Sequence, residues 1–160
     1  MADVLLSIVF RRPLAKIESD LRERNLVIDL KAMRIYSPRL SAQDDEALLV
    51  DVTYADDVAI PALCDDNRCI EEVAKTLVAI SPSRFLEHGM HVNYKQGKSG
   101  IMACINGRGA NAAREGWYGS TQLNVDTASG QTLVTKERVY RHLGGAVSYT
   151  HLTLPTICRV

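Results

Sequence analysis

Two adjacent aspartates, Asp56 and Asp57, stand in the middle of an apolar, β-prone stretch, LLVDVTYADDVAIPALC, at residues 48–64. Neighbouring carboxylates repel each other, and an apolar setting raises the pKa of at least one of them unless a cation shares the site. Two explanations are open. Either the pair occupies an exposed turn, where aspartate is common, or it recruits a divalent metal ion.

The residues on both sides of the pair predict its backbone. Apolar side chains alternate in part along residues 47–53, as in a strand with one buried face, and a second apolar run follows at residues 58–63. Aspartate is a good turn residue between two such runs. The sequence therefore predicts a β-hairpin whose tip is Asp56 and Asp57.

Helices and further short strands are expected around this hairpin. Apolar spacings of three and four predict helices over residues 4–21 and 67–80. Pro13 is expected to kink or split the first helix, and Pro82 to end or bend the second. Residues 37–46 and the glycine-rich residues 106–120 are expected to be irregular. Short strands are expected within residues 25–30, 33–36, 88–94, 97–105 and 131–145. The order predicts an α+β fold, a small antiparallel sheet with helices packed on one face.

Composition limits the class of protein less than the distribution of charge does. The chain has 160 residues, 46% hydrophobic and 24% charged, which is typical of one globular domain or part of one. Its formal net charge is zero, yet residues 43–72 carry net −9, residues 84–145 carry +4 and residues 1–42 carry +3. An acidic centre between basic arms suits a metal site beside a polyanion, and solvated faces of opposite sign explain it equally well.

Cysteine spacing and the N-terminal residues bear on the compartment. The chain has four cysteines: Cys64, Cys69, Cys104 and Cys158. They lack CxxC spacing, and no histidines follow them at zinc-finger intervals. Free thiols in a reducing, intracellular compartment are therefore expected. The first residues lack a basic signal-peptide region, and their apolar run is too short to span a bilayer, so no membrane partner is expected.

The string Tyr54-Ala55-Asp56-Asp57 between apolar strands resembles the catalytic palm motif of reverse transcriptases. Later segments are similar to that family in the same order. HGMHVNYKQGKSG follows the second helix, and VYRHLGG resembles the primer-gripping element of non-LTR retrotransposon enzymes. The opening MADVLLSIVF looks like the helix that follows the family's Gln-Gly motif. The resemblance covers residues 1–145, which are identified as a partial palm domain.

The resemblance implies an RNA-directed DNA polymerase that transfers nucleotides with two Mg²⁺ or Mn²⁺ ions. It makes Asp56 the principal metal ligand and Asp57 the supporting one, with Tyr54 and Ala55 close to the primer backbone. It assigns Lys98 to the departing pyrophosphate, although a solvated turn lysine is the alternative. The implied partners are an RNA template, a DNA primer and deoxynucleoside triphosphates.

The same resemblance places basic and aromatic residues of the VYRHLGG segment on the primer. Tyr140 and Arg141, together with Arg138, are expected to contact primer phosphates or sugars, as such side chains commonly do.

The chain also departs from the family pattern. A further aspartate is expected before residue 1, the fingers and thumb are missing, and Lys98 precedes Ser99-Gly100, where threonine and glutamate are common in the family. This chain alone is therefore not expected to polymerise DNA. Two alternatives stay open: a catalytically dead retroelement remnant with weak nucleic-acid binding, and an unrelated α+β interaction module whose acidic hairpin is only a solvated turn.

The last residues differ in character from the rest. Residues 147–160, VSYTHLTLPTICRV, resemble a translated sequencing adapter, so residues 146–160 are expected to be a non-native tail. A natural β-prone C-terminus is the alternative.

Overall fold

The computed structural model describes residues 2–29, 48–49, 52–54, 57–138, 140–142 and 145–147. The chain divides into two compact units, residues 1–63 and 64–160. Helices combine with small sheets, so the predicted α+β class is confirmed. The strand predicted at 33–36, the irregular segment predicted at 37–46 and nearly all of the predicted tail lie outside the described residues.

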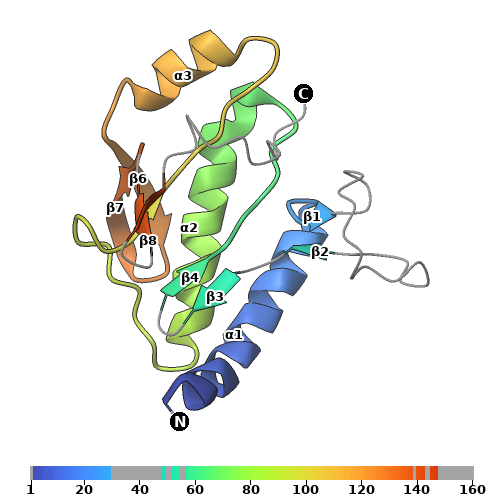
Figure 1. Cartoon of the computed structure of the whole chain (residues 1–160), viewed down its shortest axis with the longest axis vertical. Helices are drawn as coiled ribbons and strands as arrows, with labels where there is room; N and C mark the ends of the chain where they lie inside the picture. The colour runs from blue at the N-terminus through green and yellow to red at the C-terminus, as the bar shows by residue number, and fades with distance from the viewer. Residues whose placement is uncertain are drawn as a thin grey trace. The chain divides into compact units, whose positions relative to one another are not determined.

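Among its described residues, the first unit contains one long helix and two short antiparallel strand pairs (Figure 1). The predicted strand at 47–53 is divided between these two pairs, because its first half pairs with β1 and its second half with β4. The elements are α1 (Ala2–Glu23), β1 (Ile28–Asp29), β2 (Leu48–Leu49), β3 (Val52–Tyr54) and β4 (Asp57–Ala59).

Helix α1 continues through Pro13, so the expectation that this proline splits the helix is wrong. An internal proline removes one backbone hydrogen bond and costs about 3 kcal/mol. Pro13, Ile17 and Leu21 are fully buried at intervals of four residues, and this burial offsets the cost. Ile8, whose apolar spacing in the sequence predicts a core-facing side chain, is 64% exposed, because it lies nine residues, about two and a half turns, from Ile17.

Two backbone hydrogen bonds end α1. The N–H of Leu26 donates to the carbonyl of Leu21 at 2.9 Å, and the N–H of Asn25 donates to Arg22 at 3.1 Å. Asn25 has φ of 55°, in the left-handed region that asparagine tolerates. This is a Schellman motif with asparagine in the place that glycine most often takes.

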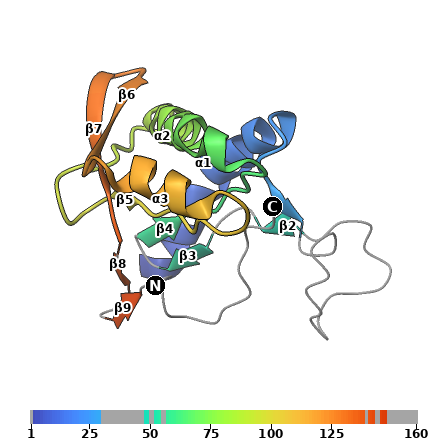
Figure 2. The ribbon, with the colours of Figure 1, turned by 90° about the horizontal axis from the view of Figure 1, so that it is seen from above.

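The second unit contains a three-stranded sheet in the order β5-β7-β6, with β6 antiparallel and β5 parallel to β7. Strands β8 and β9 form a separate antiparallel hairpin beyond the end of β7 (Figure 2). The elements are η1 (Asn67–Cys69), α2 (Ile70–Leu86), β5 (Gly100–Ile101), α3 (Ala110–Tyr118), β6 (Gln122–Thr127), β7 (Gly130–Lys136), β8 (Tyr140–His142) and β9 (Gly145–Val147).

The core of the second unit lies between the sheet and its helices. α2 runs alongside β6, and side chains of α2 and α3 meet one face of β6 and β7. The opposite face is exposed, as Asn124 and Leu133 show. The predicted arrangement, with helices on one face of the sheet, is confirmed. The buried cluster consists of Ala74, Val78, Ile105, Ala110, Trp117, Leu123, Val125 and Val134.

Helix α2 also passes through a proline. The prediction that Pro82 ends this helix is wrong, since the helix continues to Leu86, and the alternative that Pro82 bends it stays a prediction. The hydroxyls of Ser81 and Ser83 donate to the carbonyls four residues earlier, both at 2.8 Å, beside the proline. The true end is a Schellman motif at Gly89, whose φ is 73° and whose N–H donates to Leu86, while Met90 donates to the Phe85 carbonyl at 3.0 Å.

Two further predictions for the second unit are wrong. Residues 106–120 were expected to be irregular, but α3 occupies most of them. Gly107 and Gly109, with φ of 86° and 77°, only form the turn before that helix. The expected strand within 88–94 is absent from these described residues. Tyr94 instead packs against the core, and burial raises its pKa to about 12.

Candidate active site

The acidic pair lies at the connection between β3 and β4. Tyr54 is directly opposite Asp57, and Val52 is opposite Ala59, in antiparallel register. Asp57 is therefore the first paired residue of β4 rather than part of the tip. The predicted hairpin is confirmed for its two strands, while Ala55 and Asp56, the two residues between them in sequence, lie outside the described residues.

The donor chemistry of this hairpin suits a hard divalent cation. Adjacent carboxylates offer oxygen ligands, which Mg²⁺ and Mn²⁺ prefer, and a cation relieves the repulsion between them. The two carboxylates of Asp56 and Asp57 are too few to complete the coordination shell of such an ion. Among the side chains that the structure describes, no group of three or more histidine, cysteine, aspartate or glutamate residues gathers as a metal site. Asp56 and Asp57 would therefore share the ion with water, with substrate phosphates or with a further carboxylate.

Lys98 belongs to the second unit, in an exposed turn after α2. Its N–H donates to the carbonyl of Lys95 at 3.0 Å, and the N–H of Lys95 donates to the side-chain oxygen of Asn93 at 3.1 Å. Gly97 completes the turn with φ of 77°. An ammonium group in such a turn can reach a phosphate in solution, which is the chemistry that its predicted role needs.

The structure explains why glycine occupies position 100, two residues after Lys98, where the resembling family commonly has another residue. Its strand β5 lies beside β7, with Gly100 level with Thr135. A Cβ at this position would lie 2.8 Å from Cγ of Glu137 and 3.1 Å from the carbonyl oxygen of Thr135. A side chain here would crowd both Glu137 and the Thr135 carbonyl, so the close approach of the two strands favours glycine at this position.

The predicted primer-contacting residues Tyr140 and Arg141 lie on β8, opposite Val147 and Ala146 of β9. The segment that resembles the primer-gripping element thus contributes an antiparallel hairpin. The strand β9 includes the first two residues of the predicted tail.

Arg138 lies just before this hairpin and contacts an aromatic ring. Its guanidinium carbon is 4.6 Å from the ring centre of Tyr118, at the distance of a cation–π contact. Burial raises the pKa of Tyr118, and the positive charge of Arg138 lowers that pKa in part. The Tyr118 hydroxyl donates to the carbonyl of Ala103 at 3.4 Å. Arg138 therefore has a structural contact in addition to its predicted role at the primer.

Lys136 was not singled out from the sequence, yet its side chain is buried, on the same side of β7 as Val134. Its side chain is 7% exposed and donates to the Trp117 carbonyl at 3.0 Å and the Ser120 hydroxyl at 3.1 Å. It also lies 4.5 Å from the Trp117 ring centre. A cation at the last carbonyls of a helix is stabilising, so Lys136 holds the end of α3. Its spacing of two residues from buried Val134 could have revealed this.

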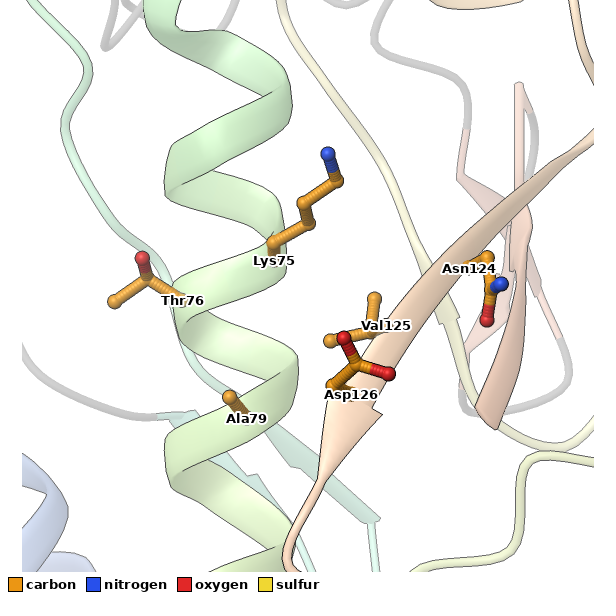
Figure 3. A pocket seen from close by; sticks show the side chains of 6 residues that line it. All are labelled: Lys75, Thr76, Ala79, Asn124, Val125 and Asp126. Atoms are coloured by element: carbon orange, nitrogen blue, oxygen red, sulfur yellow. The ribbon is translucent and has the colours of Figure 1, made fainter. Parts of the chain in front are cut away.

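A hollow of about 340 Å³ lies between α2 and β6 (Figure 3). Lys75 and Ala79 on α2 stand opposite Val125 and Asp126 on β6. The ammonium of Lys75 is already paired with two glutamates of its own helix, at 3.0 and 3.1 Å, and they raise its pKa. Because Lys75 is already paired and Asp126 adds negative charge on the other side, the hollow is poorly suited to bind a phosphate.

The chain matches no protein-family model, no curated protein and no solved structure. The likeness to reverse transcriptases therefore rests on the motifs and their order alone. Within the described part of the chain, no helix has both the length and the apolar character that crossing a bilayer would require.

Proposed function

We propose that this chain is the palm region of a reverse transcriptase of the non-LTR retrotransposon type, in which Asp56 and Asp57 hold the catalytic Mg²⁺ or Mn²⁺. One observation carries the proposal. The Tyr-Ala-Asp-Asp string lies across an antiparallel strand pair in which Tyr54 is opposite Asp57. In sequence, Ala55 and Asp56 stand between these paired positions, so Asp56 directly precedes the first paired residue of β4.

The order of the remaining elements supports the same proposal. α2 follows the hairpin, the exposed turn of Lys98 follows α2, and the β8–β9 hairpin comes last. This is the order in which the resembling segments occur in the family.

Each residue has a part in this proposal. When bound, the metal ions would activate the primer 3′-hydroxyl and stabilise the charge of the leaving pyrophosphate. Asp56 and Asp57 hold them, and the small side chain of Ala55 leaves room for the primer backbone. Lys98 supplies positive charge to the departing pyrophosphate. Tyr140 orients the primer together with the basic side chains beside it.

Primer extension by a longer chain that supplies the third carboxylate tests the proposal. Asp56→Asn removes one negative ligand without changing the shape of the side chain, so extension should fall by several orders of magnitude. Asp65→Asn, which changes an exposed aspartate outside the pair, is the matched control and should extend primers normally. Full activity of the Asp56→Asn enzyme would remove this residue from the mechanism.

The role of Lys98 is tested in the same assay. Lys98→Ala should lower kcat with little change in the KM for nucleotide, because the charge acts on the leaving group rather than on binding. Lys95→Ala, in the same turn, is the control. A higher KM with unchanged kcat would instead assign Lys98 to nucleotide binding.

A further inference from the structure

The first residues of the second unit bring the thiol of Cys64 and the backbone of Cys69 to one carbonyl oxygen. The thiol of Cys64 donates to the carbonyl oxygen of Asp66 at 3.0 Å, and the backbone N–H of Cys69 donates to the same oxygen at 2.9 Å. Because both donors share one acceptor, Sγ of Cys64 and N of Cys69 are less than about 6 Å apart. Neither cysteine is in a disulfide. This separation is compatible with a bond that needs Cα atoms within about 7 Å.

The turn that holds them is fixed by contacts inside the second unit. The carboxylate of Asp66 accepts from the N–H of Arg68 at 2.9 Å and pairs with its guanidinium at 2.5 Å, which also lowers the pKa of Asp66. The side-chain amide of Asn67 donates to the carbonyls of Asn106 at 3.2 Å and Arg108 at 3.0 Å. The two cysteines therefore start from a restrained geometry.

The two thiols differ in their exposure to solvent, and therefore in which of them reacts first with an oxidant. Cys69 is exposed, whereas Cys64 is partly buried. Burial raises the pKa of the Cys64 thiol, and the nearby charges of Cys69, Asp65 and Asp66 add to that increase. An oxidant in solution therefore meets Cys69 first. The other free cysteine in the described part of this unit, Cys104, accepts a hydrogen bond from Asn106 at 3.3 Å.

We propose that Cys64 and Cys69 form a reversible disulfide that closes the turn between β4 and α2. With oxidised glutathione, the Cys69 thiolate attacks one glutathione sulfur, forms a mixed disulfide and releases one reduced glutathione. The Cys64 thiolate then attacks Sγ of Cys69 and releases the second. The protein loses two electrons and two protons, and oxidised glutathione takes up both. This inference does not depend on the proposed polymerase function.

Peptide mapping of the full chain after treatment with oxidised glutathione tests the proposal. Trypsin cuts after Arg68, so Cys64 and Cys69 fall on different peptides, and only a disulfide joins them under non-reducing conditions. The expected product is the peptide ending at Arg68 linked to Cys69–Lys75 at every protein concentration, as an intrachain bond requires. Reduction should separate the two peptides.

Variants show which thiols react. Cys69→Ser, an exposed and conservative change, should abolish the linked peptide, and Cys104→Ser should leave its yield unchanged. Cys64→Ser should stop the reaction at the glutathione adduct of Cys69. Linkage of Cys104 to either residue, or a stable glutathione adduct on Cys69 of the unaltered chain, would overturn the proposal.

The pH dependence tests which thiol closes the bond. Because burial raises the pKa of Cys64, little of its thiol is ionised at pH 7, and the rate of closure should rise steadily between pH 7 and 9. A closure rate that is flat over this range would contradict attack by Cys64.

Discussion

The β3–β4 and β6–β7 hairpins have similar backbones and different sources of stability. Both are antiparallel, and in both the register leaves two residues for the connection. β6–β7 has six paired positions and one face buried under two helices, whereas β3–β4 has three paired positions and two neighbouring aspartates at its connection. One hairpin is therefore stabilised mainly by packing, and the other carries like charges that a cation would neutralise.

The largest expected effect is the loss of stability when the largest core side chain beside the β6–β7 hairpin is removed. Trp117→Ala deletes an indole that is 3% exposed, and a buried tryptophan lost from a core costs about 3 to 5 kcal/mol. Denaturant unfolding of the second unit should show this loss. Leu133→Ala on the exposed face of the same sheet, where the side chain is 56% exposed, should cost less than about 1 kcal/mol. Equal effects would mean that the sheet is not stabilised by its buried face.

An intermediate loss of stability is expected when the buried ammonium group of Lys136 is removed. Lys136→Met keeps the aliphatic stem but leaves the Trp117 carbonyl and the Ser120 hydroxyl without this donor, which should cost about 1 to 3 kcal/mol. Lys95→Met at an exposed position is the control and should stay within about 0.5 kcal/mol. Unfolding curves of the two variants give the difference. A Lys136→Met protein as stable as the unaltered chain would show that desolvation of the ammonium cancels its hydrogen bonds.

The smallest effect is expected at the acidic hairpin without metal. Asp57→Asn removes one of two like charges and should change stability by no more than about 0.5 kcal/mol. With Mn²⁺ at ten times its dissociation constant, the unaltered chain should gain about 1.4 kcal/mol, and the variant should gain much less. Thermal melts with and without Mn²⁺ measure both differences. An equal gain in the two proteins would place the ion elsewhere.

Local features were predictable from the sequence, and features that depend on distant contacts were not. The strands beside Asp56 follow from alternation and from the turn preference of aspartate, and α2 follows from its apolar spacing. The end of α2 was misplaced because Pro82 is a strong local signal. Packing of Val78 and Phe85 retains the helix to Leu86, and the motif that closes it has its left-handed residue at Gly89.

The second unit's sheet shows the same limit. α3 was missed because its glycines suggested a loop, while the burial of Trp117 that stabilises the helix is a tertiary contact. β6 was missed because only Leu123 and Val125 mark its buried face. For the candidate site, the sequence identifies Asp56 and Asp57 as possible metal ligands. It does not identify the further ligands of a complete coordination shell, because these would come from groups distant in the chain or from substrate and water.

Mn²⁺ binding to the full chain tests most directly whether the acidic pair is a metal site. The electron paramagnetic resonance signal of free Mn²⁺ falls as the ion binds, so a titration gives the dissociation constant. We predict that Asp56→Asn and Asp57→Asn each weaken binding at least about tenfold, which is about 1.4 kcal/mol, and that Asp65→Asn binds like the unaltered chain. The same affinity in all four proteins would contradict the account, because the hairpin would then be an acidic turn without a metal.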